Sequence, residues 1–269
     1  MLDVTRQLLR YRGLLWTLVV RELKGRYRGS FLGFFWSLVN PLLLLAVYSF
    51  VFTYIFRPRF ADGGADPYPL FLMCGLFPWV WVSTSLLEGT DSLLAGAGLL
   101  RKAVFPAEIL PMVFVVSNLA HFLLALPVLA GGLVIGRLLD HPVGGWGAAW
   151  LPLIIGLEFL VVGGMTLGLA ALNVHFKDVK DILTNVLSVL LYLTPVLFPL
   201  SFIQWDWGRW AIGWLNPFAP FSTAFQQTLF EGVPPEPALI GHMVGWAILS
   251  WVVGTWFFSR LSDSLVEAV

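Results

Sequence analysis

Residues 21–28 read RELKGRYR, and residues 32–41 read LGFFWSLVNP. The first segment is dominated by charged side chains, whereas the second has none and opens a long apolar run. A cationic segment that leads directly into an apolar one is typical of the cytoplasmic boundary of a membrane span. This junction therefore predicts a first span that begins near residue 34, with the N-terminus in the cytoplasm.

The composition indicates that lipid is the solvent of most of the chain. Of the 269 residues, 58% are hydrophobic and 12% are charged, against roughly 25% charged residues in a typical soluble domain. The net charge of zero gives no sign of a nucleic-acid partner, and the single cysteine, Cys74, excludes an intramolecular disulfide. The N-terminal residues do not resemble a cleaved signal peptide, because no short apolar region with a small-residue cleavage site follows them.

Six apolar runs approach or exceed the length of about 20 residues that a membrane-spanning helix needs. They are continuous rather than alternating with a period of two, which favours helices over barrel strands. An even number of spans puts both termini on one side, and the excess of Lys and Arg on that side places it in the cytoplasm. The predicted fold class is an all-α integral membrane protein with six transmembrane helices, at residues 34–56, 69–87, 107–135, 150–174, 182–200 and 238–258.

The remaining segments complete the predicted domain organisation. Residues 1–30 are expected to form a cytoplasmic amphipathic interface helix, which either anchors the chain to anionic lipid or docks a cytosolic partner. It leads into a transmembrane domain at residues 31–260, followed by a cytoplasmic tail at residues 261–269. Within the transmembrane domain, residues 88–106 form a cytoplasmic loop, and residues 201–237 form an outer segment with short re-entrant helices before the last span.

Catalytic and metal-binding patterns are absent from the sequence. No Gly-Lys-Ser/Thr is present, so the chain has no Walker A phosphate cradle of its own. His175 and Asp178 could share a helical face, but a metal site needs more ligands. Glu158 is a carboxylate inside a span, and we favour a snorkelling or pore-facing role for it over a catalytic one. The tryptophans of the outer segments are interpreted as an interfacial belt rather than a ligand site.

Several motifs run in order across nearly the whole chain. They are RELKxRY at 21–27, LGxxW at 32–36 with Pro41, Tyr48 and Phe52, GLFPW at 75–79, LxKxxFPxExxP at 100–111, LNVxFxDV at 172–179, TPV at 194–196 and LNP at 215–217. In this order they resemble the membrane subunit of bacterial polysaccharide ABC exporters, the type-2 permeases that move O-antigen, teichoic acid or capsule chains. One departure from the family pattern is Gly98, where many relatives carry Asn, at the expected start of a cytoplasmic gate helix.

This resemblance implies a transport subunit of the bacterial cytoplasmic (inner) membrane rather than an enzyme. ATP and Mg²⁺ would bind a separate nucleotide-binding ATPase subunit, present in two copies, and this chain would carry no cofactor. The other implied partners are a second copy of the chain, membrane lipids and a polyprenyl-pyrophosphate-linked glycan.

The resemblance also implies roles for three groups of residues. Aromatic rings suit a glycan channel because they contact sugar faces without trapping a polymer, although the same rings could simply pack in the core or face lipid. The loop at residues 88–106 would be the cytoplasmic gate and coupling region, and the residues of the ATPase-coupling gate would be Leu100, Arg101, Lys102, Phe105, Pro106 and Glu108. The interface helix would contribute Arg21, Glu22, Lys24, Arg26 and Arg28. The channel, bordered by spans one and five, would contain Trp36, Tyr48, Phe77, Trp79, Trp81 and Tyr192.

Three alternatives remain open at this point. A type-2 exporter of a drug or small lipid would leave surface glycan unchanged on deletion. A membrane enzyme acting on polyprenyl lipids would be active without nucleotide or partner, but the sequence has no acid–base cluster for it. A purely structural membrane scaffold is compatible with the composition, although the ordered motifs argue against it.

Overall fold

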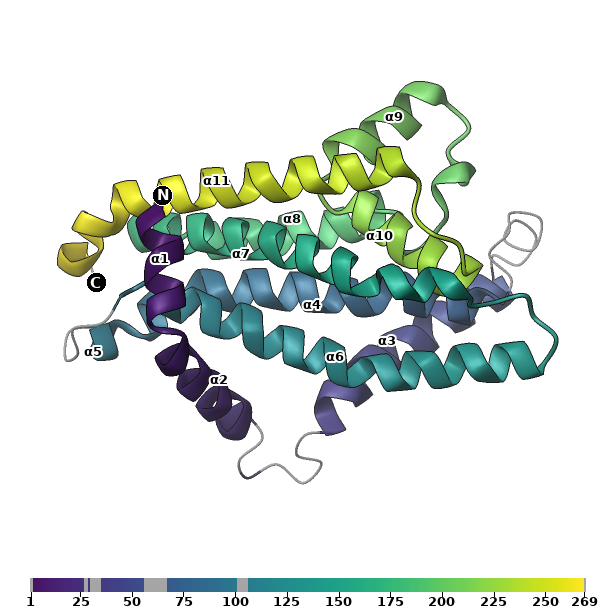
Figure 1. Cartoon of the computed structure of the whole chain (residues 1–269), viewed down its shortest axis with the longest axis horizontal. Helices are drawn as coiled ribbons and strands as arrows, with labels where there is room; N and C mark the ends of the chain where they lie inside the picture. Colours follow the sequence, from purple (N-terminus) through teal and green to yellow (C-terminus); the bar gives the residue numbers. More distant parts are fainter. Residues whose placement is uncertain (1, 27–28, 30–34, 56–66, 101–105, 269) are drawn as a thin grey trace.

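The computed structural model describes residues 2–26, 29, 35–55, 67–100 and 106–268, and their regular structure is entirely helical, with no strand among them. Figure 1 shows a bundle of long helices with both chain ends at one end of it, here called the terminal end; the opposite end is called the far end. The helices long and apolar enough to cross a membrane are α4 (Tyr68–Ala95), α6 (Ile109–Leu138), η4 with α7 (Trp146–Trp150 and Leu151–His175) and α11 (Pro237–Ala268).

Helix α4 forms the centre of the bundle. It packs against α6, α7 and α8 (Val179–Leu193), and it is the most buried of the four long helices. Pro69 in its first turn suits a helix start, since the missing amide hydrogen would be unpaired there anyway. The helix continues to Ala95, eight residues beyond the predicted end of span two.

Helices α7 and α11 lie in direct backbone contact. A side chain at Gly164 would collide with the backbone of Ser250, and one at Gly254 would collide with the backbone of Gly164. Gly168 lies one turn further along α7 and also faces Gly254. Small residues at this spacing let membrane helices approach closely, because dispersion and backbone contacts replace the hydrophobic effect between them.

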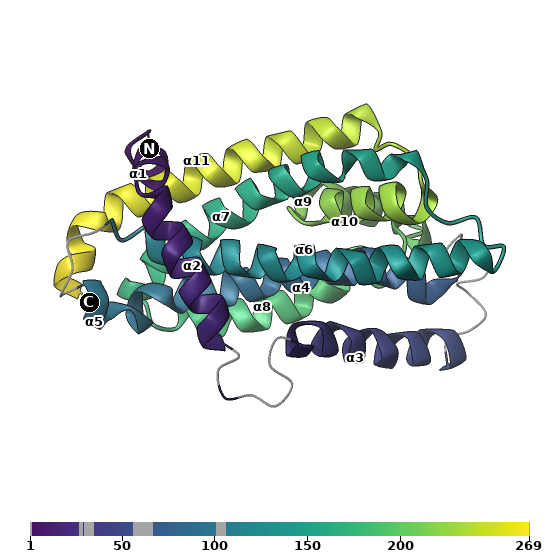
Figure 2. The same ribbon diagram turned by 60° about the horizontal axis from the view of Figure 1, so that its bottom comes forward.

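The predicted first and fifth spans correspond to shorter helices. Residues 34–56 contain α3 (Trp36–Phe50), which continues into the π-helical turn η2 (Val51–Ile55) along one side of the bundle (Figure 2). The predicted helix at residues 182–200 is too long, since α8 ends at Leu193 and Thr194 is extended with ψ of 142°. Pro195 explains this end, because proline disfavours helical backbone in the residue before it and cannot donate to the helix.

The N-terminal segment crosses the terminal end as two helices rather than one. The single interface helix predicted for residues 1–30 is interrupted at Tyr11, between α1 (Leu2–Arg10) and α2 (Arg12–Arg26). Helix α1 contacts α11, and α2 packs against α6, as both views show (Figures 1 and 2). The short helix α5 (Ala97–Leu100) follows α4 at the same end.

The far end contains the short helices expected between spans five and six. They are η5 (Leu200–Phe202), α9 (Asp206–Leu215), α10 (Ala219–Phe225) and the π-helical η6 (Gln226–Glu231). Helix α9 stands away from the bundle (Figure 1) and exposes Trp207, Trp210 and Trp214. Helix α10 is buried, with Phe221 and Phe225 fully covered.

Candidate functional site

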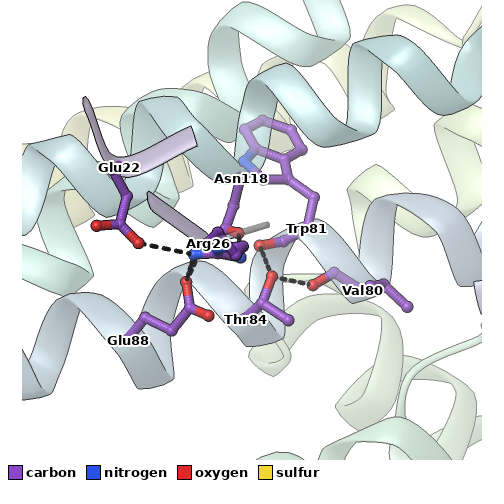
Figure 3. Close-up of polar contacts among 7 residues, drawn as sticks. All are labelled: Glu22, Arg26, Val80, Trp81, Thr84, Glu88 and Asn118. Atoms are coloured by element: carbon purple, nitrogen blue, oxygen red, sulfur yellow. Dashed lines mark hydrogen bonds and ion pairs between the residues drawn. The ribbon is translucent and has the colours of Figure 1, made fainter. Parts of the chain in front are cut away.

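Arg26, at the end of α2, ties the basic segment to the bundle. Its guanidinium donates to Oε2 of Glu88 at 2.6 Å and to Oδ1 of Asn118 at 3.1 Å, and Glu22 lies 3.6 Å away one turn earlier. Asn118 closes the triangle by donating to the same Glu88 oxygen at 2.7 Å (Figure 3). One cation therefore joins α2, α4 and α6 through charge-assisted hydrogen bonds, which are stronger than neutral ones.

Two further contacts converge on the same end of α4. Lys180, at the start of α8, forms an ion pair with Asp91 at 2.8 Å. Asn173, near the end of α7, donates to the Thr90 carbonyl at 3.2 Å and accepts the Lys180 amide hydrogen at 3.2 Å. Helices α2, α6, α7 and α8 are thus all joined to the last two turns of α4. We call Arg26, Glu88, Asn118, Asp91 and Lys180 the terminal-end network.

A cleft of about 290 Å³ separates α2 from the region predicted as the gate. Arg21 and Glu22 line one side of it, and Gly96, Gly98 and Leu110 line the other. Arg12, Arg21 and Lys24 are exposed, unlike Arg26, so they are the described cations of this helix that a partner can reach, and Arg21 is the one of these three that lines the cleft. The cleft brings the predicted interface helix next to the predicted gate region.

Of the predicted gate residues, the structure describes the side chains of Pro106 and Glu108. Pro106 is half-buried, and Glu108 is buried directly before the first turn of α6. Burial raises the pKa of the Glu108 carboxyl above its usual value, and a hydrogen bond from its own backbone partly offsets this. Five other predicted site residues have side chains outside the described part of the chain, so their roles stay predictions. They are Arg28, Leu100, Arg101, Lys102 and Phe105.

A cavity of about 110 Å³ lies next to Arg26, between α2, α3, α4 and α6. Its polar lining includes Arg26, Asn40 and Thr84, and its aromatic lining includes Phe77 and Trp81. Predicted interface and channel residues thus share one cavity. Polar groups facing aromatic rings form a lining that suits a sugar, which presents both hydroxyls and apolar C–H faces.

The other predicted channel residues lie elsewhere. Trp79 packs edge-on against Phe218 at 5.9 Å, on the side of α4 that meets α10. Tyr48 of α3 and Tyr192 of α8 are hydrogen-bond partners, which places the predicted first and fifth spans next to each other there. Trp36 and Tyr192 are exposed. The six aromatic residues therefore occupy several surfaces of one chain rather than a single continuous wall.

At the far end, α10 and η6 cover the break after α8. The Pro195 carbonyl accepts Ser222 Oγ at 2.9 Å and Gln226 Nε2 at 2.6 Å. Asn216 donates to Thr194 Oγ1 at 2.8 Å and to the Leu193 carbonyl at 3.3 Å, and its own oxygen accepts the Phe218 amide hydrogen. Irregular backbone at membrane depth needs such partners because lipid provides none. The TPV and LNP motifs, distant in sequence, thus meet here.

Sequence reasoning missed the terminal-end network because its partners are far apart in the chain. Glu88 and Asn118 lie 62 and 92 residues from Arg26. Glu88 directly follows the second apolar run, and Asn118 is a polar residue inside the third, and such polar residues in or beside apolar runs are the signal that could have found them. No group of three or more His, Cys, Asp or Glu residues able to hold a metal occurs in the described part of the chain. Glu158 is buried within α7, and its Oε2 has no hydrogen-bond partner among the described residues.

Comparisons with known proteins place these features in a family. The sequence profile of the ABC-2 type transporter family matches residues 13–230. The O-antigen export system permease protein RfbA of Myxococcus xanthus is 38% identical over 98% of both chains. The protein of that name from Klebsiella pneumoniae is 29% identical over 92% of this chain and 91% of its own length. The polysialic acid transport protein KpsM of Escherichia coli is 20% identical over 93% of this chain and 94% of its own length. The chain therefore belongs to the ABC-2 type transporter family, as a membrane permease.

Proposed function

We propose that this chain is the membrane subunit of an ATP-driven exporter that moves a lipid-linked, O-antigen-like polysaccharide out of the cytoplasm. The observation that carries the proposal is the similarity to the RfbA permease of Myxococcus xanthus over 98% of both chains. The cavity lined by Arg26, Phe77 and Trp81 supports it, because it offers both polar and aromatic surface to a sugar.

The proposed assembly contains two copies of this chain and two copies of a separate ATPase subunit, which binds ATP and Mg²⁺. In this arrangement the six predicted spans cross the bacterial cytoplasmic membrane, and both termini face the cytoplasm. The exposed cations Arg21 and Lys24, together with the segment around Arg101 and Lys102, contact the ATPase. The cargo is a polyprenyl-pyrophosphate-linked glycan that enters between spans one and five.

The terminal-end network is the proposed route by which the ATPase acts on the bundle. A displacement of α2 acts on α4 through Glu88 and on α6 through Asn118, because Arg26 binds both side chains. Helix α4 carries Phe77 and Trp81 on the cavity wall a few turns away. A change at the cytoplasmic surface can therefore reach the aromatic lining through one continuous helix.

Deletion of the gene in its own bacterium tests the cargo. We expect loss of surface polysaccharide, accumulation of the lipid-linked glycan in the cytoplasm, and recovery of both when the gene is supplied on a plasmid. Unchanged surface glycan in the deletion strain would contradict the proposed cargo and favour export of a drug or small lipid.

Copurification tests the ATPase partner. A tagged copy of this chain is expected to retain a nucleotide-binding subunit, and Arg101→Glu with Lys102→Glu is expected to weaken that association. The control is Arg209→Glu, a charge reversal at the far end. Wild-type copurification and export in the double variant would show that this segment does not couple the two subunits.

A further inference from the structure

A groove at the far end of α6 is not used by the proposed transport path. It has a volume of about 560 Å³, within the range of roughly 300–1,000 Å³ typical of ligand sites. Leu126, Ala130 and Leu133 of α6 form one wall, and Leu151 of α7 and Leu229 of η6 form the other. Arg137, in the last turn of α6, and Trp146, at the start of η4, lie at its rim.

The groove has a rigid frame. The loop between α6 and η4 is pinned to the end of η6 by hydrogen bonds from the Gly144 amide to the Phe230 carbonyl at 2.9 Å and from the Gly147 amide to the Gly232 carbonyl at 3.0 Å. A side chain at Gly145 would meet the backbone of Gly232, so the two segments are in contact. The groove is therefore built into the fold rather than opened by a mobile loop.

The position and length of the groove match one leaflet of a bilayer. Trp146 is 94% exposed, and exposed tryptophans in membrane proteins concentrate at the headgroup level. From Arg137 the groove follows α6 back to Leu126, a distance of roughly 16 Å at the helical rise of about 1.5 Å per residue. Half of a typical hydrocarbon core is about 15 Å. A chain that enters at Arg137 would thus end near the bilayer midplane.

The charge at the rim selects the headgroup. Arg137 is exposed in the last turn of α6, and the ion pairs of the described residues involve Arg26 and Lys180 but not Arg137. The acidic residues on the adjoining elements are Asp140, just beyond α6, Glu231, at the end of η6, and Glu158, which is buried within α7. A guanidinium with no carboxylate in ion-pair contact is free to bind a phosphate through two parallel hydrogen bonds.

We propose that this groove binds one acyl chain of an anionic phospholipid of the surrounding bilayer, with the lipid phosphate on Arg137. The apolar walls bury the chain, and Trp146 packs at the headgroup level beside it. The lipid fills the space between α6, α7 and η6 and supports the far end of the bundle. This site requires only that α6 and α7 span a membrane, so it does not depend on the identity of the exported cargo.

Native mass spectrometry of the full-length chain tests the site. Phosphatidylglycerol and phosphatidylethanolamine with identical acyl chains are titrated separately into the delipidated protein. We expect phosphatidylglycerol to bind about tenfold more tightly, because the ammonium group of phosphatidylethanolamine offsets the charge of the phosphate that both lipids carry; a tenfold difference corresponds to about 1.4 kcal/mol. Arg137→Gln is expected to remove this preference, whereas Arg209→Gln, at a second arginine of the far end that does not line the groove, is expected to keep it.

A pair of neighbouring substitutions tests the groove itself. Ala130→Phe fills it, and we expect phosphatidylglycerol binding to fall at least tenfold, or about 1.4 kcal/mol. Gly131→Phe adds the same side chain at a position where a Cβ meets nothing within 4 Å, and binding is expected to be unchanged. Equal binding of both lipids by the wild type, or unchanged binding in Ala130→Phe, would overturn the proposal. Loss of dimer mass in Ala130→Phe would also overturn it, since the groove would then hold a second copy of the chain.

Discussion

At the terminal end, α2, α4, α6 and α8 are joined by charged side chains, whereas at the far end α8, α10 and η6 are joined by neutral amides and hydroxyls. Arg26 and Glu88 keep 23% and 36% of their side-chain surface exposed, while Asn216, Ser222 and Gln226 are buried. Water and salt weaken the first kind of contact. The second kind leaves a buried polar group unpaired when it breaks, which costs more.

This difference fits the proposed division of labour between the two ends. The terminal end, where the ATPase would act, contains contacts that can rearrange at modest cost. The far end holds the irregular backbone around Pro195 in place, and its contacts have no solvent to replace them. The predictions below test this contrast and, with it, the burial of Glu108, in order of decreasing expected effect.

Asn216→Ala should give the largest loss of stability. It removes the hydrogen bonds to Thr194 and Leu193 and leaves the buried Phe218 amide without its acceptor, a loss of about 2–3 kcal/mol. Thermal unfolding in detergent measures the change. Asn185→Ala removes an exposed asparagine from α8 and serves as the matched control. Equal melting temperatures for the two variants would contradict the structural role assigned to Asn216.

Glu88→Ala should destabilise the protein less, by about 1–2 kcal/mol, because water partly replaces the lost partner of Arg26. The difference from wild type should shrink as salt concentration rises. Glu88→Gln keeps an oxygen that can accept from Asn118, so its effect should be smaller.

The salt dependence of the stability loss distinguishes the contacts at the far end from those at the terminal end. The effect of Asn216→Ala should not change between low and high salt, because the bonds it removes are neutral and buried. The contrast between the ends would fail if both variants responded to salt in the same way.

Glu108 should make stability depend on pH. Because burial raises its folded-state pKa above the usual 4.5, the folded state holds the proton more tightly than the unfolded state. Its contribution to stability is therefore present at low pH and is lost as pH rises from about 4.5 through the raised value. Glu108→Gln should flatten the melting temperature over this range, and Glu236→Gln, at an exposed carboxylate, should not. A wild-type slope in Glu108→Gln would argue against this assignment.

Asp91→Asn should have the smallest effect. Its ion pair with Lys180 joins side chains that are 36% and 45% exposed, and such pairs contribute about 0.2–1 kcal/mol. A double-mutant cycle with Lys180→Met isolates the pair. A coupling energy well above this range would mean that the pair is shielded from water in the assembled transporter.

The long helices could be predicted from the sequence because continuous apolar runs have few alternatives in a membrane. Helix α4 starts at Tyr68, one residue before the start predicted at Pro69, and proline favours the first turn of a helix. The end of α8 was missed because hydropathy continues to Leu200, while Pro195 stops the helix earlier. The break at Tyr11 has no comparable signal, because no proline occurs there and the Gly next in sequence is Gly13.

The candidate site was less predictable than the helices. The resemblance assigns Arg26 to the interface helix, but its partners Glu88 and Asn118 depend on how α2 crosses the bundle. The aromatic residues of one motif also diverge, because Phe77 faces the cavity beside Arg26 while Trp79 faces Phe218. Neighbouring positions on a helix point in different directions, so a motif does not define a wall.

Transport in inside-out membrane vesicles tests the central claim most directly. Vesicles containing this chain and its ATPase partner are supplied with a radiolabelled polyprenyl-linked glycan on their outer surface and then treated with a glycosidase. The account predicts that ATP moves the glycan into the lumen, where it is protected from digestion, and that protection is lost without ATP or without this chain. Complete digestion in the presence of ATP, with the ATPase fully active and the chain present, would contradict it.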